Sequence, residues 1–384
     1  MTTTLPTTTD VLVVGAGPTG LTLAIGLAQS GHDVTVVDHQ AAGDNTSRAA
    51  VVHSHTLEAL EPYGVVERLT TEGIHAPRFT IRDHDRVLVP VPFSELPTAY
   101  PYLLMISQAT TETILLDRFT ELGGHVHRPF TLTTLAQDDA GVTASFSDGE
   151  RVRAAYVVGA DGMHSTVRQE AGIGFSGDTY PESFVLADVH LGGAIPDDEV
   201  IMYFSPEGPV VVAPLPGGSH RIVATVDNAP KEPDAALVQD LLDTRGSRAQ
   251  RTEVQDVIWS SRFRVHHRVA DTYRAGRIML AGDAAHVHSP AGGQGMNAGI
   301  TDAAALSQVL GRVLSGESPE LLESYGASRR PVAKQVVALA SRLTRVATAN
   351  RALRPVRNAM LGLLGRIPRF RTRLAHQLSG LVYR

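Results

Sequence analysis

Cysteine is absent from the 384 residues of this sequence, and tryptophan occurs only once. The lack of cysteine excludes disulfide bonds, thiolate metal sites and a cysteine nucleophile. No uncharged apolar run reaches the roughly 18 residues that a membrane-spanning helix needs. The N-terminal segment before Val11 has no basic side chain, and the apolar run that follows is short. We therefore expect no secretory signal and a cytoplasmic protein.

Aspartate and glutamate are missing from residues 324–384, where twelve arginines and one lysine give a charge of +13. The whole chain carries a net charge of -6, so the remaining residues carry -19. This acidic balance argues against nucleic-acid binding. We predict that the basic tail packs on the acidic body and that the protein attaches to no membrane. The alternative is a tail helix that contacts a membrane surface or a protein partner.

Hydrophobic residues make up 43% of the chain and charged residues 19%, which is typical of a globular protein. The length is enough for two or three domains of roughly 100 to 200 residues each. The chain begins with a βαβ pattern. A short β-branched run, Asp10 to Val14, leads into Gly15 to Gly20, then into a helical pattern that stops near Gly31, and then into a second apolar run, Val34 to Val37.

Two later stretches, Arg78 to Leu103 and about Ser183 to Arg264, are rich in strand patterns and predict one inserted domain. Its clearest hairpin joins Val200–Phe204 to Val210–Leu215. After Asp302 the chain is predicted to be helical, with breaks at Pro331, Pro355 and Pro368. The fold class is thus α/β, with a Rossmann-like nucleotide-binding domain and an inserted α+β substrate domain that has a mixed sheet. The expected domains are 1–72, 101–180 and 272–338 for nucleotide binding, 73–100 and 181–271 for substrate, and 339–384 for a C-terminal helical segment.

The glycine-rich turn Gly15-x-Gly17-x-x-Gly20 has the spacing of a dinucleotide-binding site, and Asp38 ends the second strand. Glycines let backbone amides approach a pyrophosphate at a helix N-terminus, and the acidic side chain accepts ribose hydroxyls. This pattern does not distinguish FAD from NAD. A second match, Gly172 to Gly177, follows a charged helical segment and predicts only a turn. The chain therefore has one dinucleotide fold.

Three further segments resemble the single-component FAD-dependent aromatic hydroxylases that share the para-hydroxybenzoate hydroxylase fold, and in particular those that hydroxylate polyketides in antibiotic biosynthesis. They are AYVVGADGMHSTVR at 155–168, GRIMLAGDAAH at 276–286 and PAGGQGMN at 290–297. The resemblance covers nearly the whole chain. It implies bound FAD, with NADPH or NADH as reductant, and these FAD-contacting residues: Gly15, Gly17, Pro18, Thr19, Gly20, Asp38, His39, Arg48, Gln108, Asp161, Gly162, Asp283, Pro290, Gly293, Gly295, Met296 and Asn297.

Several of these residues also have a simpler structural interpretation. Asp283 follows an apolar run and lies at a strand end, where it faces the flavin ribityl chain and phosphates in the family or else caps the next helix. Asp161 and Gly162 resemble a motif that serves both FAD and NADPH, or else form a turn before Ser165. The glycines at 292–295 lead into a helix whose N-terminus favours an anion such as reduced flavin.

The sequence gives little support to other chemistries. His53 and His55, like His286 and His288, form a pair that no third ligand joins at metal-binding spacing, so we predict no metal. Ser165 lacks the turn of a hydrolase nucleophile.

The family also has features that this chain lacks. His39 replaces its usual basic residue, His55 stands where an arginine is expected, and Ala305-Leu306 replaces Asn-Leu. Only three residues follow Leu381, so we expect no C-terminal thioredoxin-like domain and a monomer or homodimer.

The resemblance implies an NAD(P)H- and O₂-dependent FAD monooxygenase that hydroxylates a phenolic or polyketide-derived aromatic small molecule through a C4a-hydroperoxyflavin. Arg48 is the one candidate for a catalytic role, in moving or reducing the flavin. Baeyer–Villiger oxygenation and epoxidation are alternatives, and a flavin-holding binding protein without catalysis is a third. Tyr203, Val211 and Pro214 lie on the hairpin expected to cover the substrate pocket, although alternation does not tell which face points inward.

Overall fold

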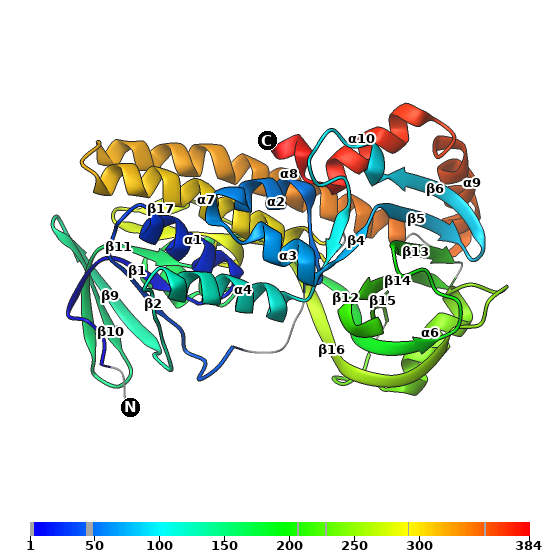
Figure 1. The fold of residues 1–384 in the computed structure, drawn as a ribbon, viewed down its shortest axis with the longest axis horizontal. Helices are drawn as coiled ribbons and strands as arrows, with labels where there is room; N and C mark the ends of the chain where they lie inside the picture. The colour runs from blue at the N-terminus through cyan, green and yellow to red at the C-terminus, as the bar shows by residue number, and fades with distance from the viewer. Residues whose placement is uncertain (1–3, 44–48, 206, 227–228, 291, 349–350) are drawn as a thin grey trace.

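The structure is a computed structural model that describes residues 4–43, 49–205, 207–226, 229–290, 292–348 and 351–384. Two large sheets lie side by side along the long axis of the molecule (Figure 1). The long helices α7 (Gln294–Leu314) and α8 (Glu323–Ala347) lie together above the first sheet and contact each other.

The first sheet has the strand order β17-β18-β11-β1-β2-β8, in which all neighbours except β17 and β18 run parallel. β9 and β10 extend it as an antiparallel pair beside β11. Its strands are β1 (Thr8–Val14), β2 (Val34–Val37), β8 (Val126–His127), β9 (Leu132–Asp138), β10 (Gly141–Phe146), β11 (Arg151–Gly159), β17 (Arg274–Ala275) and β18 (Ile278–Leu280).

The predicted βαβ unit is confirmed. β1 and β2 pair in parallel with Val11 opposite Val34, and α1 (Pro18–Gln29) joins them. The last four residues of β1 are buried, as expected for a parallel strand covered on both faces. α1 packs against α7 and against α4 (Gln108–Glu121), so α1 meets elements from two distant parts of the chain.

The second sheet has the order β19-β16-β12-β15-β14-β13-β5-β6. The predicted hairpin is confirmed, with Tyr203 on β13 opposite Val210 on β14. α6 (Ala235–Arg245) packs against this sheet, and α9 (Arg354–Leu364) and α10 (Pro368–Leu378) pack against β6. The strands are β5 (Arg78–Asp83), β6 (Arg86–Pro92), β12 (Phe175–Gly192), β13 (Glu199–Ser205), β14 (Gly208–Leu215), β15 (Ser219–Thr225), β16 (Glu253–Ala270) and β19 (His286–Val287).

The two strand-rich stretches of the sequence share this second sheet, because β5 pairs in parallel with β13. The exact domain limits stay a prediction. β12 already begins at Phe175, and β19, from the third nucleotide-binding stretch, pairs with β16. A small sheet, β3-β7-β4, lies between these parts, and its strands and the remaining helices are β3 (Val51–Val52), β4 (Ile74–Ala76), β7 (Leu103–Met105), α2 (Ser54–Leu60), α3 (Val66–Glu72) and α5 (Thr166–Glu170).

The predicted helix break at Pro331 was wrong, because α8 continues through this residue. A proline inside a helix removes one backbone hydrogen bond and crowds the preceding turn. Here the side chains on the N-terminal side of the proline hold the helix in place. Arg329 Nε donates to Asp302 Oδ1 at 2.7 Å, and Arg330 Nε donates to the carbonyl of Ala270 at 3.0 Å. Pro355 and Pro368 do mark boundaries, since each lies in the first turn of a new helix.

Candidate FAD site

The glycine-rich turn after β1 leaves no room for side chains at two of its positions. Gly15 has φ +106°, and a Cβ there would lie 2.3 Å from the carbonyl oxygen of Ala160. A Cβ on Gly20 would lie 1.9 Å from the carbonyl oxygen of Gly15. At Gly17, the N-cap of α1, a Cβ would meet only Glu112 Oε1 at 4.0 Å. The helix N-terminus is thus open at the position where a pyrophosphate binds in this type of turn.

Asp38 follows β2 and is buried beside the same turn. Its Oδ2 accepts the backbone N–H of Ala16 at 2.8 Å, and its Oδ1 accepts that of Gln40 at 2.9 Å. The carboxylate therefore fixes the glycine turn and keeps lone pairs for ribose hydroxyls. His39 is mostly exposed, with Nδ1 3.6 Å from Asp38 Oδ1, so it contributes little to the shape of the turn.

The four central parallel strands end at one edge of the sheet, and each end carries a predicted FAD residue. In the order β18, β11, β1 and β2, these are Asp283, Asp161, Gly15 and Asp38. The carboxyl edge of an open parallel sheet is where ligands of α/β proteins bind. This common edge comes from the strand order, since the four residues are far apart in the sequence.

Asp283 lies in a short 3-10 helix, Gly282–Ala284, and its side chain is exposed. It is the second residue of that helix, and α7 has Gly293 as its N-cap, so Asp283 is the N-cap residue of neither. Gly282 has φ +62°, and a Cβ there would lie 2.6 Å from Thr19 Oγ1. Gly282 therefore lies directly against Thr19, and Asp283 follows it next to the first turn of α1.

Asp161 serves the fold locally and also leaves one oxygen available. Its Oδ2 accepts the backbone N–H of Val167 at 3.1 Å, and Ser165 caps α5 by accepting that of Arg168 at 2.9 Å. Asp161 and Gly162, with φ +77° at Gly162, thus do form a turn before the helix cap Ser165. Within the described part of the chain, Asp161 Oδ1 is buried without a hydrogen-bond partner. Burial raises the pKa of this carboxyl.

The loop before α7 is held in shape from several sides. Asn297 Oδ1 accepts the backbone N–H of His53 at 2.8 Å, while its Nδ2 donates to the carbonyls of Val51 and Gly293. Gly293 has φ +62°, where a Cβ would lie 2.4 Å from Val51 Cγ1. Asn297, predicted to contact FAD, thus uses its amide to position the loop. The other predicted contacts, Pro290, Gly295 and Met296, belong to the same segment.

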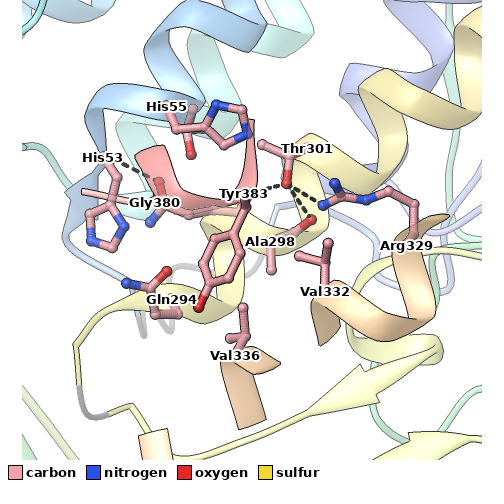
Figure 2. A pocket seen from close by; sticks show the side chains of 12 residues that line it. His53, His55, Gln294, Ala298, Thr301, Arg329, Val332, Val336, Gly380 and Tyr383 are labelled. Atoms are coloured by element: carbon pink, nitrogen blue, oxygen red, sulfur yellow. Dashed lines mark hydrogen bonds between the residues drawn. The ribbon is translucent and has the colours of Figure 1, made fainter. Parts of the chain in front are cut away.

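A small pocket lies behind this loop, between α2, α7, α8 and the C-terminal residues (Figure 2). Gln294 Nε2 donates to the carbonyl of Leu378 at 3.2 Å, and the ring of Tyr383 lies across the pocket. Burial lowers the pKa of His53 to about 3, so this histidine is neutral at physiological pH. In the sequence, His53 was weighed only as a metal ligand. In the structure its backbone N–H binds Asn297, so it helps to hold the loop before α7. The pocket is lined by His53, His55, Thr56, Gln294, Asn297, Ala298, Thr301, Arg329, Val332, Val336, Gly380 and Tyr383.

A buried ionic network that the sequence did not reveal joins this region to α8. Asp302 Oδ2 is 2.6 Å from His286 Nε2, and Asp302 Oδ1 accepts Arg329 Nε at 2.7 Å. All three residues are less than a tenth exposed. Burial acts to raise the pKa of Asp302, but His286 and Arg329 outweigh it and hold the pKa below its usual value. The network fixes β19, which lies between Asp283 and the loop of α7.

Gln108 begins α4 and binds the chain at Ala49. Its backbone N–H donates to the Ala49 carbonyl at 3.0 Å, and its Oε1 accepts the Ala49 N–H at 3.3 Å.

Arg48, the candidate for flavin movement, lies outside the described residues. No group of three or more His, Asp or Glu side chains is close enough to hold a metal ion in the part of the chain that the structure describes.

The predicted pocket residues on the hairpin point to opposite faces of the second sheet. Val211 packs against the cluster that includes Leu103 and Met105 of β7, next to β3 and the α7 loop. Tyr203 belongs to the cluster that α6 covers, and Pro214 shares the face of Val212 in that cluster because side chains alternate along a strand. Tyr203 and Pro214 therefore cannot line the same wall as Val211, so the three residues do not form one pocket wall together, and which face meets a substrate stays a prediction.

The fold and site together define a Rossmann-like dinucleotide-binding protein with a second, mixed sheet beside the first. The chain belongs to the FAD-binding domain family, which matches residues 8–340. In the described residues no helix is long and apolar enough to cross a membrane.

Named relatives extend this assignment. The chain is 38% identical over 351 residues to the 12-dehydrotetracycline 5-monooxygenase/anhydrotetracycline 6-monooxygenase of Streptomyces rimosus, covering 85% of this chain and 68% of that protein. It is 33% identical over 340 residues to the pentachlorophenol 4-monooxygenase of Sphingobium chlorophenolicum, covering 85% of this chain and 63% of that one.

Solved structures show the same fold. The anhydrotetracycline hydroxylase OxyS of Streptomyces rimosus has a TM-score of 0.80 at 34% identity, over 97% of this chain and 76% of that chain. The p-nitrophenol 4-monooxygenase PnpA of Pseudomonas putida has a TM-score of 0.86 at 25% identity, over 98% of this chain and 99% of that chain.

Proposed function

We propose that this protein is an NAD(P)H- and O₂-dependent FAD monooxygenase that hydroxylates a phenolic or polyketide-derived aromatic small molecule. The observation that carries this proposal is the meeting of Gly15, Asp161 and Asp283 at one sheet edge. The apolar wall that contains Val211 and packs on β7 is the proposed substrate side of the site. The named relatives support the choice of substrate class, because one acts on 12-dehydrotetracycline and anhydrotetracycline and the other on pentachlorophenol.

The residues of the chain fit FAD. The uncovered N-terminus of α1 suits the pyrophosphate, Asp38 suits a ribose, and Asp283 suits the region between pyrophosphate and flavin. When bound, FAD would supply the redox centre that NAD(P)H reduces and that activates O₂. The N-terminus of α7, rigidly positioned through Asn297, stabilises negative charge near it.

Residues around the proposed flavin position would orient the substrate, exclude water and admit NAD(P)H. The apolar wall of the second sheet excludes water and orients an aromatic ring. With a single dinucleotide fold, NAD(P)H reaches the flavin without a glycine turn of its own, and Asp161 with Gly162 is the proposed place where it acts. Arg48 is the proposed residue for flavin movement. A monomer or homodimer in the cytoplasm is the proposed working state.

The test combines flavin content, reduction rate and the origin of the inserted oxygen. The purified protein is expected to be yellow, with one noncovalent FAD per chain. A phenol or polycyclic ligand is expected to accelerate flavin reduction by NAD(P)H and to gain one ¹⁸O atom from ¹⁸O₂. Label in a lactone or an epoxide would select one of the alternative oxygenations. Reduction that no ligand accelerates, with all electrons recovered as hydrogen peroxide, would contradict the proposal.

A further inference from the structure

Large apolar side chains are exposed at one end of the molecule. Of the nine exposed in the described part of the chain, six lie between Val346 and Ile367. On α9, Val356 is 67% exposed, Met360 52% and Leu363 63%. We call the row formed with the flanking Leu353 and Ile367 the α9 face. A contiguous exposed apolar row of this kind marks a binding surface more often than a solvated one.

The α9 face follows from how the helix is anchored. Val356, Met360 and Leu363 are spaced by four and three residues, so they share one side of the helix. The inner side is buried, where Arg357 and Asn358 both donate to the carbonyl of Phe204 at 3.0 Å. α9 lies at the outer end of the molecule beside β6 (Figure 1), so its apolar side points away from the body.

Three exposed arginines lie at the end of this row and beyond it along the chain. Arg366, Arg369 and Arg373 are exposed, and none of the ion pairs found among the described residues includes them. Residues 324–384 contain no acidic side chain that could neutralise them. The combination of aliphatic side chains with unneutralised arginines matches the acyl chains and phosphates of an anionic lipid surface.

We propose that the α9 face binds the surface of an anionic membrane, with its apolar side chains inserted and its arginines against phosphate groups. From the sequence we predicted that the basic tail packs on the acidic body. Val336 and Leu343 do pack inward, but α9 does not bury its outer side. A symmetric contact between two copies through this face is less favourable, because each copy would bring the same basic segment to the contact, and residues 324–384 offer no acidic side chain to pair with it.

The test measures sedimentation of the FAD-loaded full chain with vesicles of phosphatidylcholine, with and without phosphatidylglycerol. The face variant V356S/L363S is compared with a matched control, I258S/V382S, whose residues are exposed by 53% and 48% and lie outside the α9 face. A third variant, R366Q/R369Q/R373Q, removes the charges. All variants change exposed side chains, and thermal melting and FAD content verify their folding.

We expect binding to the anionic vesicles only, weakened by salt. The face variant should bind at least tenfold more weakly, the charge variant on the order of 100-fold more weakly, and the control like the wild type. The proposal is overturned if the wild type ignores anionic vesicles at low salt, or if the face variant binds as well as the control. Vesicle-free dimers that dissociate only in the face variant would assign the face to a second copy instead. None of these outcomes depends on monooxygenase activity.

Discussion

The turn after β1 and the wall formed by β14 show two different ways of building a ligand site. In the turn, Gly15, Gly17 and Gly20 are close in sequence, and their own backbone determines what they can bind. In the wall, Val211 and Val212 are sequence neighbours of the same type, yet they belong to different apolar clusters on opposite faces. A local motif therefore specifies its own chemistry, whereas a strand residue takes its role from what covers each face of the sheet.

The largest effect is expected for Asp302→Asn, which tests contacts made only by the tertiary structure. The substitution removes the charge that binds both His286 and Arg329. Loss of the carboxylate leaves Arg329 buried without its counter-charge, and unfolding in urea should show a loss of about 3–5 kcal/mol. Asp256→Asn, in an exposed pair with His190, is the control and should change stability by about 0–1 kcal/mol. Equal effects would mean that the buried network does not support the loop of α7.

The same variant has a characteristic dependence on pH. The pKa of Asp302 is depressed in the folded protein, so its stabilisation is complete above the unfolded pKa of about 3.9 and is lost as pH falls through the folded pKa. The wild type should therefore lose stability in acid more steeply than Asp302→Asn. Urea unfolding at a series of pH values below about 5 measures this difference.

Gly15→Ala tests the glycine-rich turn after β1, whose own backbone determines what it can bind. The added Cβ would meet the carbonyl oxygen of Ala160, and the backbone has φ +106°. We expect a loss of about 3 kcal/mol or more and little bound FAD. Gly31→Ala is the matched control, since its φ is +82° with nothing within 4 Å of the new Cβ. It should cost only about 1–2 kcal/mol and retain FAD. Melting temperature and flavin absorbance report both quantities.

Asp283→Ala tests whether a residue at the sheet edge serves the ligand or the fold. Removal of this exposed carboxylate should weaken FAD binding by about 1–3 kcal/mol with little change in melting temperature. Asp148→Ala, in an exposed turn of the same sheet, should leave FAD affinity unchanged and cost at most about 1 kcal/mol of stability, because its Oδ1 accepts only the exposed N–H of Glu150. A lower melting temperature with unchanged FAD affinity would assign Asp283 a structural role. Equilibrium titration of apoprotein with FAD gives the affinities.

The smallest expected effect separates the two faces of β14. Val211→Ala should change KM for the aromatic substrate two- to tenfold, or by about 1 kcal/mol, and leave stability nearly unchanged. Val212→Ala should lower stability by about 1–2 kcal/mol and leave KM alone, because Val212 is buried under α6. The comparison between the faces fails if the two variants have the same kinetic effect.

The sequence alone determined the nucleotide-binding unit and its class. Gly15 to Gly20, the helix after them and Asp38 form contacts within about 25 residues, so spacing and hydrophobic pattern are sufficient to predict them. The segments at Asp161, Asp283 and Gly293 were recognised through their resemblance to the aromatic hydroxylases, which is possible because each is a short continuous run of residues.

Only the tertiary structure decided which residues meet. The Asp302 network joins residues 16 and 27 positions apart, and Asn297 holds a backbone amide 244 residues away. The passage of α8 through Pro331, the face to which Val211 points and the outward side of α9 also depend on which elements pack together. No local pattern encodes these choices, because propensities act within a few residues, whereas burial and ion pairing depend on the neighbours that the complete fold supplies.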